Sequence, residues 1–253
     1  MTKMILSGCN GRMGQAITRL TEQTENCRVV CGFDINTKQQ NDYPVLDEYD
    51  RFDAEADVIV DFSNPANLER LIAFAIERKL PCVIATTGLT KDQVALLRET
   101  ANKIPVFYSA NMSLGVNLII ELASRAAKLL EGSFDIEIIE KHHNQKLDAP
   151  SGTALAIADA ISDSLKTAPQ YIYDRHSVRK KREANEIGIH AVRGGTIVGE
   201  HSVLFAGNDE IIELKHSATS REVFAVGAVK AGIFLAGKPA GLYSMKELVN
   251  EMA

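Results

Sequence analysis

The sequence predicts an α/β fold with a doubly wound parallel sheet, joined to a second, α+β domain with a mixed or antiparallel sheet. Two observations predict this organisation. Short β-branched runs alternate with amphipathic helical patterns over the first 110 residues, as in a parallel sheet that helices cover on both faces. After residue 112 the strand-like runs alternate in polarity and follow one another closely, which favours an antiparallel or mixed sheet.

The first part contains five short runs that are mostly apolar on both faces, as buried parallel strands are. They are KMILSG (3–8), RVVCGFD (28–34), DVIVDFS (57–63), CVIATTG (82–88) and PVFYSAN (105–111). A helix is expected after the first strand, and amphipathic patterns predict helices over 65–79 and 90–103. The polar, irregular segment 35–56 is expected to form a loop.

The second part begins with a helix over 113–132, followed by an alternating strand over 134–143 and a helix over 152–165. Three further strand-like runs have hairpin-like spacing and are expected at 187–195, 196–207 and 210–218. Helical patterns over 221–237 and 244–252 close the chain. All four cysteines precede residue 83 and all six histidines lie between 142 and 216, which indicates two domains with different functions.

Composition is that of an ordinary globular protein, with 45% apolar and 24% charged residues in a chain of 253. The formal net charge of −5 gives no general attraction to nucleic acid or anionic membranes, so neither is expected as a partner. No apolar run approaches the roughly 18 residues of a membrane span, and the start MTKMILSGCNGRMG is not expected to be an export signal. The cysteines lack CxxC spacing, which suits reduced thiols in a cytoplasmic protein.

A glycine-rich turn, GCNGRMG, follows the first predicted strand and places Gly8, Gly11 and Gly14 at intervals of three. Such glycines permit a tight turn, a close approach of backbone amides to a pyrophosphate, and packing of the following helix. Asp34 ends the second strand, 20 residues after Gly14, where a carboxylate bonds the adenosine ribose. The spacing is GxxGxxG instead of GxGxxG, but its strand–turn–helix context favours a dinucleotide site over a turn without a ligand.

The preference between the two nicotinamide dinucleotides stays open. A carboxylate at Asp34 favours NADH, because it repels the 2′-phosphate of NADPH. Lys38 could offset this repulsion if its loop folds over the ribose; the alternative is a solvated lysine. We therefore expect NADH, NADPH or both.

The segment EKHHNQKLDAPSGTAL (140–155) places two histidines and a lysine directly before a helix. Neighbouring residues on a strand point to opposite faces, so His142 and His143 are poorly placed to share a metal ion, and Lys146 would repel a cation. No metal site is expected. A cysteine nucleophile is disfavoured because no cysteine lies near in sequence, and no GxSxG supports a serine hydrolase.

A positively charged site for an acidic substrate fits this segment better. Lys146 supplies a charge, and the helix that starts after Pro150 supplies free amides together with the hydroxyls of Ser151 and Thr153. The plainer alternative is an ordinary helix N-cap. For His143 the alternative is a structural histidine, although the near-neutral pKa of histidine side chains suits an acid role.

Several segments together resemble the 4-hydroxy-tetrahydrodipicolinate reductase family, also called dihydrodipicolinate reductase. They are GCNGRMG, DFSNP, ATTG, SANMSLGVN, EKHHNQKLDAPSGTAL, RGGTIVGEH and SREVFAVGAV. The resemblance implies a Rossmann-like dinucleotide domain over 1–112 and 221–253, and a central substrate-binding domain over 113–220 whose sheet builds a homotetramer. It also implies that NADH or NADPH reduces a cyclic dicarboxylate in lysine and diaminopimelate synthesis, with loss of water.

The resemblance also assigns roles to individual residues. His142 would be the proton donor, assisted by Lys146. Substrate contacts are implied for His143, Ser151, Gly152, Thr153, Thr87 and Arg221. Cofactor contacts are implied for Gly8, Cys9, Asn10, Gly11, Arg12, Met13, Asp34, Lys38, Ala85, Thr86, Thr87, Ala110, Asn111, Met112 and Ser113. The chain departs from the family at Ala85, where relatives often have glycine, and at Ile35, where some carry an arginine for the 2′-phosphate.

Two other functions remain as alternatives. One is a different dehydrogenase of a small acidic substrate. The other is a non-catalytic NAD(H)-sensing regulator, in which the basic run RHSVRKKR (175–182) would contact nucleic acid. That run has no interleaved aromatic residues, which favours a solvated loop.

Overall fold

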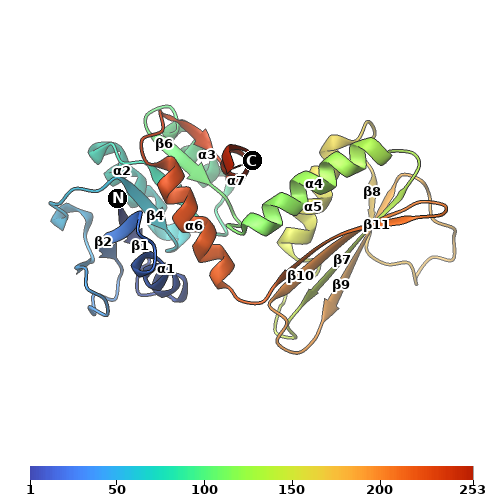
Figure 1. Cartoon of the computed structure of the whole chain (residues 1–253), viewed down its shortest axis with the longest axis horizontal. Helices are drawn as coiled ribbons and strands as arrows, with labels where there is room; N and C mark the ends of the chain where they lie inside the picture. Colours follow the sequence, from blue (N-terminus) through green and yellow to red (C-terminus); the bar gives the residue numbers. More distant parts are fainter. Residues whose placement is uncertain (253) are drawn as a thin grey trace. The chain divides into compact units, whose positions relative to one another are not determined.

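The computed structural model describes residues 1–252. The chain divides into two compact units, the first formed by Met1–Leu114 with Glu222–Ala253 and the second by Gly115–Arg221. The first unit therefore contains both ends of the sequence, and the second unit is one uninterrupted segment (Figure 1).

The first unit is built on a seven-stranded sheet in which every pair of neighbours is parallel. The strand order is β12-β6-β5-β4-β1-β2-β3. The five strands expected from the sequence are β1 (Thr2–Ser7), β2 (Cys27–Phe33), β4 (Val58–Asp61), β5 (Cys82–Ile84) and β6 (Pro105–Tyr108). Strand order reverses at β1, so the carboxyl ends of β1 and its neighbours β2 and β4 border the crevice where such sheets bind ligands.

The two edge strands were not expected. The segment 35–56, predicted to be a loop, contains β3 (Val45–Leu46) and the 3-10 helix η1 (Tyr49–Arg51). Backbone bonds from Gly32 N–H to Pro44 and from Asp34 N–H to Leu46 attach β3 to the sheet. At the other edge, β12 (Gly241–Tyr243) pairs with β6. Strands of two or three residues are too short to show a hydrophobic period, which is why the sequence did not reveal them.

Helices cover both faces of this sheet, which confirms the doubly wound arrangement. On one face α1 (Arg12–Glu22), α6 (Glu222–Leu235) and α7 (Met245–Met252) pack with Met4 and Leu6 of β1. On the other face α2 (Leu68–Arg78) and α3 (Lys91–Thr100) pack with Ile5. The short 3-10 helix η2 (Pro65–Asn67) precedes α2. Successive residues of β1 thus enter different cores, as strand geometry requires.

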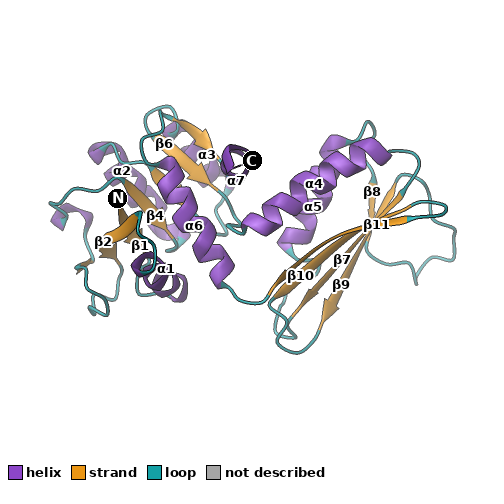
Figure 2. Cartoon of the chain, viewed as in Figure 1, coloured by secondary structure: helices purple, strands orange, loops and turns teal. Residues whose placement is uncertain are grey.

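The second unit has a five-stranded mixed sheet in the order β11-β10-β7-β9-β8, with two helices on one face. Strand β10 is antiparallel to β7 and β11, whereas β7, β9 and β8 are parallel. The strands are β7 (Asp135–His142), β8 (Gln170–Ile172), β9 (Glu186–Arg193), β10 (Gly199–Ala206) and β11 (Ile211–Ala218). The helices α4 (Leu114–Leu130) and α5 (Gly152–Ser164) touch through a bond from Ser124 Oγ to the Ala160 carbonyl (Figure 2).

The pairing of this sheet differs from the expected succession of hairpins. Strands β10 and β11 form a hairpin, but β9 and β10 are not neighbours, because β7 lies between them. Alternating side chains of β7 explain its central position: Ile136 and Ile138 are buried against the helices, and Glu140 continues the same face. The register pairs Glu140 with His201 of β10 and Ala191 of β9, so this glutamate lies in the middle of the sheet.

Within residues 1–252, no helix combines the length and the apolar character that crossing a membrane requires.

Candidate functional site

The turn between β1 and α1 has the geometry of a phosphate-binding turn. Gly8 has a φ of +79°, and a Cβ there would lie 2.6 Å from the Phe62 carbonyl oxygen. A Cβ on Gly14 would collide with the carbonyls of Gly8 and Cys9. Helix α1 begins after Gly11 with no side-chain cap and no acidic residue in its first turn. Its positive end is therefore available to an anion, and the glycines are required by close backbone contacts.

Asp34 is tied to this turn. Its Oδ2 accepts the N–H of Asn10 at 3.0 Å and its Oδ1 accepts the N–H of Asn36 at 3.0 Å. The side-chain amide of Asn10 donates in turn to the carbonyls of Asn36 and Lys38. The loop after β2 is thereby held against the glycine turn, with the carboxylate of Asp34 between them. Lys38 contributes its carbonyl to this contact.

A cavity of about 620 Å³ lies beside the turn and Asp34. Gly8, Gly11 and Ile35 line it on one side, and the segment after β4 lines it with Asn64 and Arg70. Arg70 pairs with Glu48 and lies over the ring of Tyr49. The cavity, the uncapped helix and the carboxylate together fit a dinucleotide. Sequence reasoning did not assign the lining residues after β4, although DFSNP follows a strand adjacent to β1, where such ligands bind.

The other residues expected at the cofactor follow the carboxyl ends of β5 and β6. Ala85, Thr86 and Thr87 come directly after β5, and Thr86 is buried with its hydroxyl 2.6 Å from Asp61. Burial raises the pKa of Asp61, although hydrogen bonds from Ser63 and Thr86 oppose the shift. Asp61 was not among the expected site residues.

The segment after β6 forms a compact turn in which Asn111 Oδ1 accepts the N–H of Ser113 at 2.9 Å. Ala110 is exposed at its start, whereas the side chain of Met112 lies in the core with α6. Cys9 is likewise fully buried, and burial together with the charge of Asp34 raises the pKa of its thiol to about 12. Contacts from Cys9 and Met112 to a cofactor would therefore be made by the backbone. In the first turn of α1, Arg12 is exposed and Met13 is half-buried.

In the second unit, His142 ends β7 and contacts a buried carboxylate. Its Nδ1 lies 2.6 Å from Oε2 of Glu140, which is fully buried. Arg193 of β9 donates to both oxygens of Glu140 at 2.7 Å, and the N–H of Ser151 donates to Oε1 at 2.9 Å. His142 therefore belongs to a network that joins two strands and the start of α5.

Lys146 and the start of α5 form a cationic site that already contains a carboxylate of the chain. The ammonium of Lys146 lies 2.8 Å from Asp148. The hydrogen bond from Lys146 lowers the pKa of Asp148, and the N–H of Gly152 contributes in the same direction. A Cβ on Gly152 would meet open space, so there is room above the first turn of α5. The arrangement can bind a carboxylate.

Ser151 caps α5 and also contacts a buried histidine, His201. Its Oγ accepts the N–H of Ala154 and lies 3.1 Å from Nε2 of His201. The rings of His201 and His142 are T-shaped, with centroids 5.3 Å apart. Burial, followed by the charge of His142, lowers the pKa of His201 to about 4, so it is neutral at pH 7.

The structure thus brings together His142, Lys146 and the Ser151–Gly152–Thr153 start of α5 within one unit. His143 follows the end of β7 and is half-buried, and its carbonyl accepts the N–H of Lys146. Arg221 is exposed between β11 and α6. Glu140, Arg193 and His201 were missed, although Glu140 continues the buried face of β7 as a charged residue.

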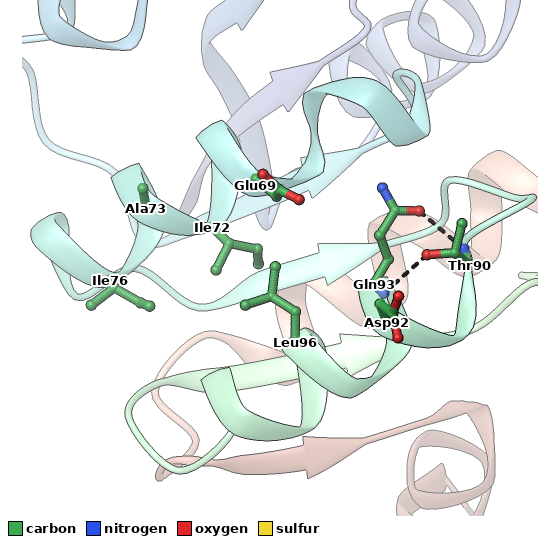
Figure 3. A pocket seen from close by; sticks show the side chains of 8 residues that line it. All are labelled: Glu69, Ile72, Ala73, Ile76, Thr90, Asp92, Gln93 and Leu96. Carbon is green, nitrogen blue, oxygen red and sulfur yellow. Dashed lines mark hydrogen bonds between the residues drawn. The ribbon is translucent and has the colours of Figure 1, made fainter.

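Two other features lie outside these sites. A groove of about 630 Å³ separates α2 from α3, and Figure 3 shows Leu96 and Ile72 facing each other across it, with the capping box of Thr90 and Gln93 at one end. This groove contains none of the expected site residues.

Among residues 1–252, no three His, Cys, Asp or Glu side chains are grouped as a metal site requires.

The basic run at 175–182 contains no helix or strand, and residues 175–181 are exposed, which confirms the solvated loop that was expected. Arg175 and Arg182 pair with Glu137, and Lys180 pairs with Glu183 and Glu186. These ion pairs neutralise much of its charge within the second unit.

Comparisons with known proteins agree over the whole chain. Residues 2–112 match the family model "Dihydrodipicolinate reductase, N-terminus", and residues 115–249 match "Dihydrodipicolinate reductase, C-terminus". The 4-hydroxy-tetrahydrodipicolinate reductase of Caldanaerobacter subterraneus subsp. tengcongensis is 52% identical over 251 residues, which is 99% of each chain. That of Clostridium tetani is 50% identical over 250 residues, covering 99% of this chain and 98% of the relative.

A solved structure supports the same assignment. The dipicolinate-bound dihydrodipicolinate reductase from Paenisporosarcina sp. TG-14 superimposes with a TM-score of 0.81 at 27% identity, covering 96% of this chain and 97% of that one. Both units and nearly all of the sequence are included in these matches. The chain therefore belongs to the dihydrodipicolinate reductase family.

Proposed function

We propose that this chain reduces 4-hydroxy-tetrahydrodipicolinate, or the dihydrodipicolinate derived from it, to tetrahydrodipicolinate with loss of water, in the synthesis of lysine and diaminopimelate. Membership of the family supports this, since the relatives named above carry that activity in their names. The observation that carries the proposal is the cationic site of the second unit, where Lys146 and the start of α5 lie beside His142.

The residues of the second unit have separable tasks. Lys146 and the amides at the start of α5, with the Thr153 hydroxyl, bind the two carboxylates of the substrate. His142 supplies the proton, because negative charge develops on the ring as it is reduced. His143, Thr87 and Arg221 are proposed to complete the substrate contacts.

A reduced nicotinamide dinucleotide supplies the hydride when bound. We propose that the amides from Gly8 to Met13 hold its pyrophosphate and that Asp34 bonds the adenosine ribose. Each oxygen of Asp34 accepts one backbone N–H, and a carboxylate has capacity for further donors. The residues after β5 and β6 are proposed to line the nicotinamide pocket.

We also propose that the chain forms a homotetramer through the sheet of the second unit. Helices α4 and α5 cover one face of this sheet. On the other face Ile211 is 67% exposed and Val192 is 44% exposed. Exposed apolar side chains on a sheet face are best covered by another copy in a closed assembly. A cytoplasmic location is proposed because all four cysteines are buried and unpaired.

The test is a spectrophotometric assay in which the substrate, made enzymatically, is added with NADH or with NADPH. We expect oxidation of at least one cofactor that depends on the substrate. Aspartate, malate and a neutral sugar serve as comparison substrates, each supplied with NAD⁺ or NADP⁺ because a dehydrogenase would oxidise them. Turnover of one of those acids without turnover of the cyclic substrate would favour a different dehydrogenase. Failure with all of them, combined with binding of NADH, would favour the regulator.

A further inference from the structure

Glu140 is a buried carboxylate that the proposed reaction does not yet use. It lies in the central strand β7, fully enclosed. A buried charge is costly unless it is paired and hydrogen-bonded. Here both oxygens are engaged by the guanidinium of Arg193, Oε1 also accepts the N–H of Ser151, and Oε2 contacts Nδ1 of His142 at 2.6 Å.

The charge on Glu140 decides which nitrogen of His142 carries a hydrogen. Desolvation acts to raise the pKa of Glu140, but the bonds from Arg193, His142 and Ser151 outweigh it and hold the pKa below its ordinary value. An ionised carboxylate only accepts hydrogen bonds, so Nδ1 of His142 must be the donor. The ring is thereby left with Nε2 as the nitrogen that can give or take a proton.

The other charged and titratable groups around the ring are consistent with this arrangement. His201 of β10 is neutral and lies edge to face with it. Lys146 is paired with Asp148 in the loop before α5. Arg193 of β9 also donates to the carbonyl of Asp148, so it ties that loop to the carboxylate of Glu140. A Cβ on Gly199 would lie 3.1 Å from Nε2, so glycine leaves space at that nitrogen.

We propose that Glu140 is a positioning residue, which holds the hydrogen of His142 on Nδ1 and so presents Nε2 as the proton donor, with Arg193 fixing the carboxylate. This inference rests on the proposed function, in which His142 gives the proton. It places the carboxylate, the histidine and the reacting proton in one line, an arrangement that orients a ring and stabilises its charged form.

A matched control lies on the same strand. Glu137 points to the opposite face of the sheet, where Nε2 of His190 contacts it at 2.8 Å and the guanidinium of Arg182 donates to it at 3.1 Å. Glu137→Gln therefore disrupts the same kind of histidine–carboxylate–arginine cluster away from the proposed substrate. A loss common to Glu140→Gln and Glu137→Gln is structural, and a loss confined to Glu140→Gln is positional.

The first experiment requires no turnover. Long-range ¹H–¹⁵N correlation spectra of ¹⁵N-histidine-labelled protein report which ring nitrogen is protonated, and the signals lost in His142→Gln assign the residue. From about pH 5 to 8, the range in which histidine side chains change charge, Nδ1 of His142 should stay protonated in the wild type and in Glu137→Gln. In Glu140→Gln the hydrogen should redistribute between the two nitrogens. A wild-type His142 that carries its hydrogen on Nε2 when neutral overturns the proposal, even if no variant folds.

The second experiment measures kcat against pH. Glu140→Gln should lower kcat by roughly 10²–10⁴-fold, the range for a disabled acid–base group. Loss of the neighbouring negative charge makes the protonated ring less stable, so the alkaline fall of kcat should move to lower pH. The affinity for pyridine-2,6-dicarboxylate should change little, and Glu140→Asp should restore part of kcat.

The two proposals fail differently. If the wild type reduces the cyclic substrate but Glu140→Gln keeps both kcat and its pH profile, the positioning role is wrong and the reductase stands. If the wild type shows no turnover of that substrate, the function is wrong, and the spectra still decide where the hydrogen of His142 resides.

Discussion

The ammonium of Lys146 lies 2.8 Å from the carboxylate of Asp148, which also faces the N–H of Gly152 at the start of α5. A carboxylate of the chain therefore occupies the position proposed for a carboxylate of the substrate. Asp148 is more than half exposed, so the pair is weak, at about 0–1 kcal/mol. We therefore propose that Asp148 competes with the substrate for Lys146 and that the substrate displaces it.

Asp148→Asn should therefore strengthen the binding of a dicarboxylate. Removing the competing charge leaves Lys146 free, and the gain should be about two- to fivefold, in line with a weak exposed pair. Calorimetric titration with pyridine-2,6-dicarboxylate measures it. Glu183→Gln, which removes a different exposed partner of a lysine, should leave the affinity unchanged. Weaker binding to Asp148→Asn would mean that Asp148 holds Lys146 in place for the substrate.

Lys146→Met should lower kcat/KM at least tenfold, since truncating one side of a buried charge pair typically costs about 2–5 kcal/mol. The methionine keeps most of the side-chain length and deletes the charge. Thr153→Val should have a smaller effect in the same direction, because the backbone amides of α5 remain. Affinity for pyridine-2,6-dicarboxylate should weaken in parallel with kcat/KM. Wild-type affinity in both variants would place the anion site elsewhere.

His142→Ala should lower kcat by roughly 10²–10⁴-fold while cofactor binding persists, because proton transfer is lost and the first unit is untouched. Steady-state kinetics gives kcat, and fluorescence titration gives the affinity for NADH. His176→Ala, at an exposed histidine in the loop before β9, is the control and should keep kcat within a few-fold. An unchanged kcat in folded His142→Ala would remove this residue from the acid role.

Asp34→Ala should weaken the binding of NADH more than the binding of NADPH. The Asp34 carboxylate accepts hydrogen bonds from the ribose hydroxyls of NADH, whereas it repels the 2′-phosphate of NADPH. Both cofactors are titrated into the variant. Asp47→Asn removes another carboxylate from the same cavity, one that pairs with Arg51, and should affect the two cofactors equally. Equal losses in Asp34→Ala would show that Asp34 does not discriminate between them.

Much of the fold could be predicted because its signals are local. The turn from Gly8 to Gly14 lies between a strand and a helix, and its glycines are required by contacts within or next to the turn. The segment from His142 to Thr153 carries its charges and its helix start within a dozen residues. The edge strands β3 and β12 could not be predicted, because two or three residues show no period and depend on a neighbouring strand for their hydrogen bonds.

The partners of His142 could not be predicted for a different reason. Arg193 is 53 positions from Glu140, and His201 is 50 positions from Ser151. They meet because β7 inserts between β9 and β10, whereas the spacing of the runs suggested that β9 and β10 pair directly. Strand order is a property of the whole sheet, so a pattern read along one segment does not contain it. The feature of the sequence that indicated this network locally is Glu140, a charged residue on the buried face of β7.

His201 makes the stability of the protein depend on pH. Burial, followed by the charge of His142, lowers its pKa to about 4 from an ordinary value of 6.5. As the pH falls below about 6.5 the unfolded chain binds a proton at this residue, while the folded chain stays neutral until about 4. Stability therefore falls with falling pH in that window, and this residue alone accounts for about 2 kcal/mol between pH 7 and 5.

Denaturant unfolding at fixed protein concentration, repeated at pH 7, 6 and 5, measures this dependence. His201→Gln should be less stable at pH 7, because it disturbs the contact with Ser151, but its stability should fall less steeply towards pH 5. His176→Gln, at an exposed histidine, should follow the wild-type slope. The comparison uses slopes instead of absolute stabilities, so the loss of packing in His201→Gln cancels. An identical slope in His201→Gln and the wild type would mean that His201 is protonated in the folded protein as readily as in the unfolded chain, and its neutral state beside His142 would have to be abandoned.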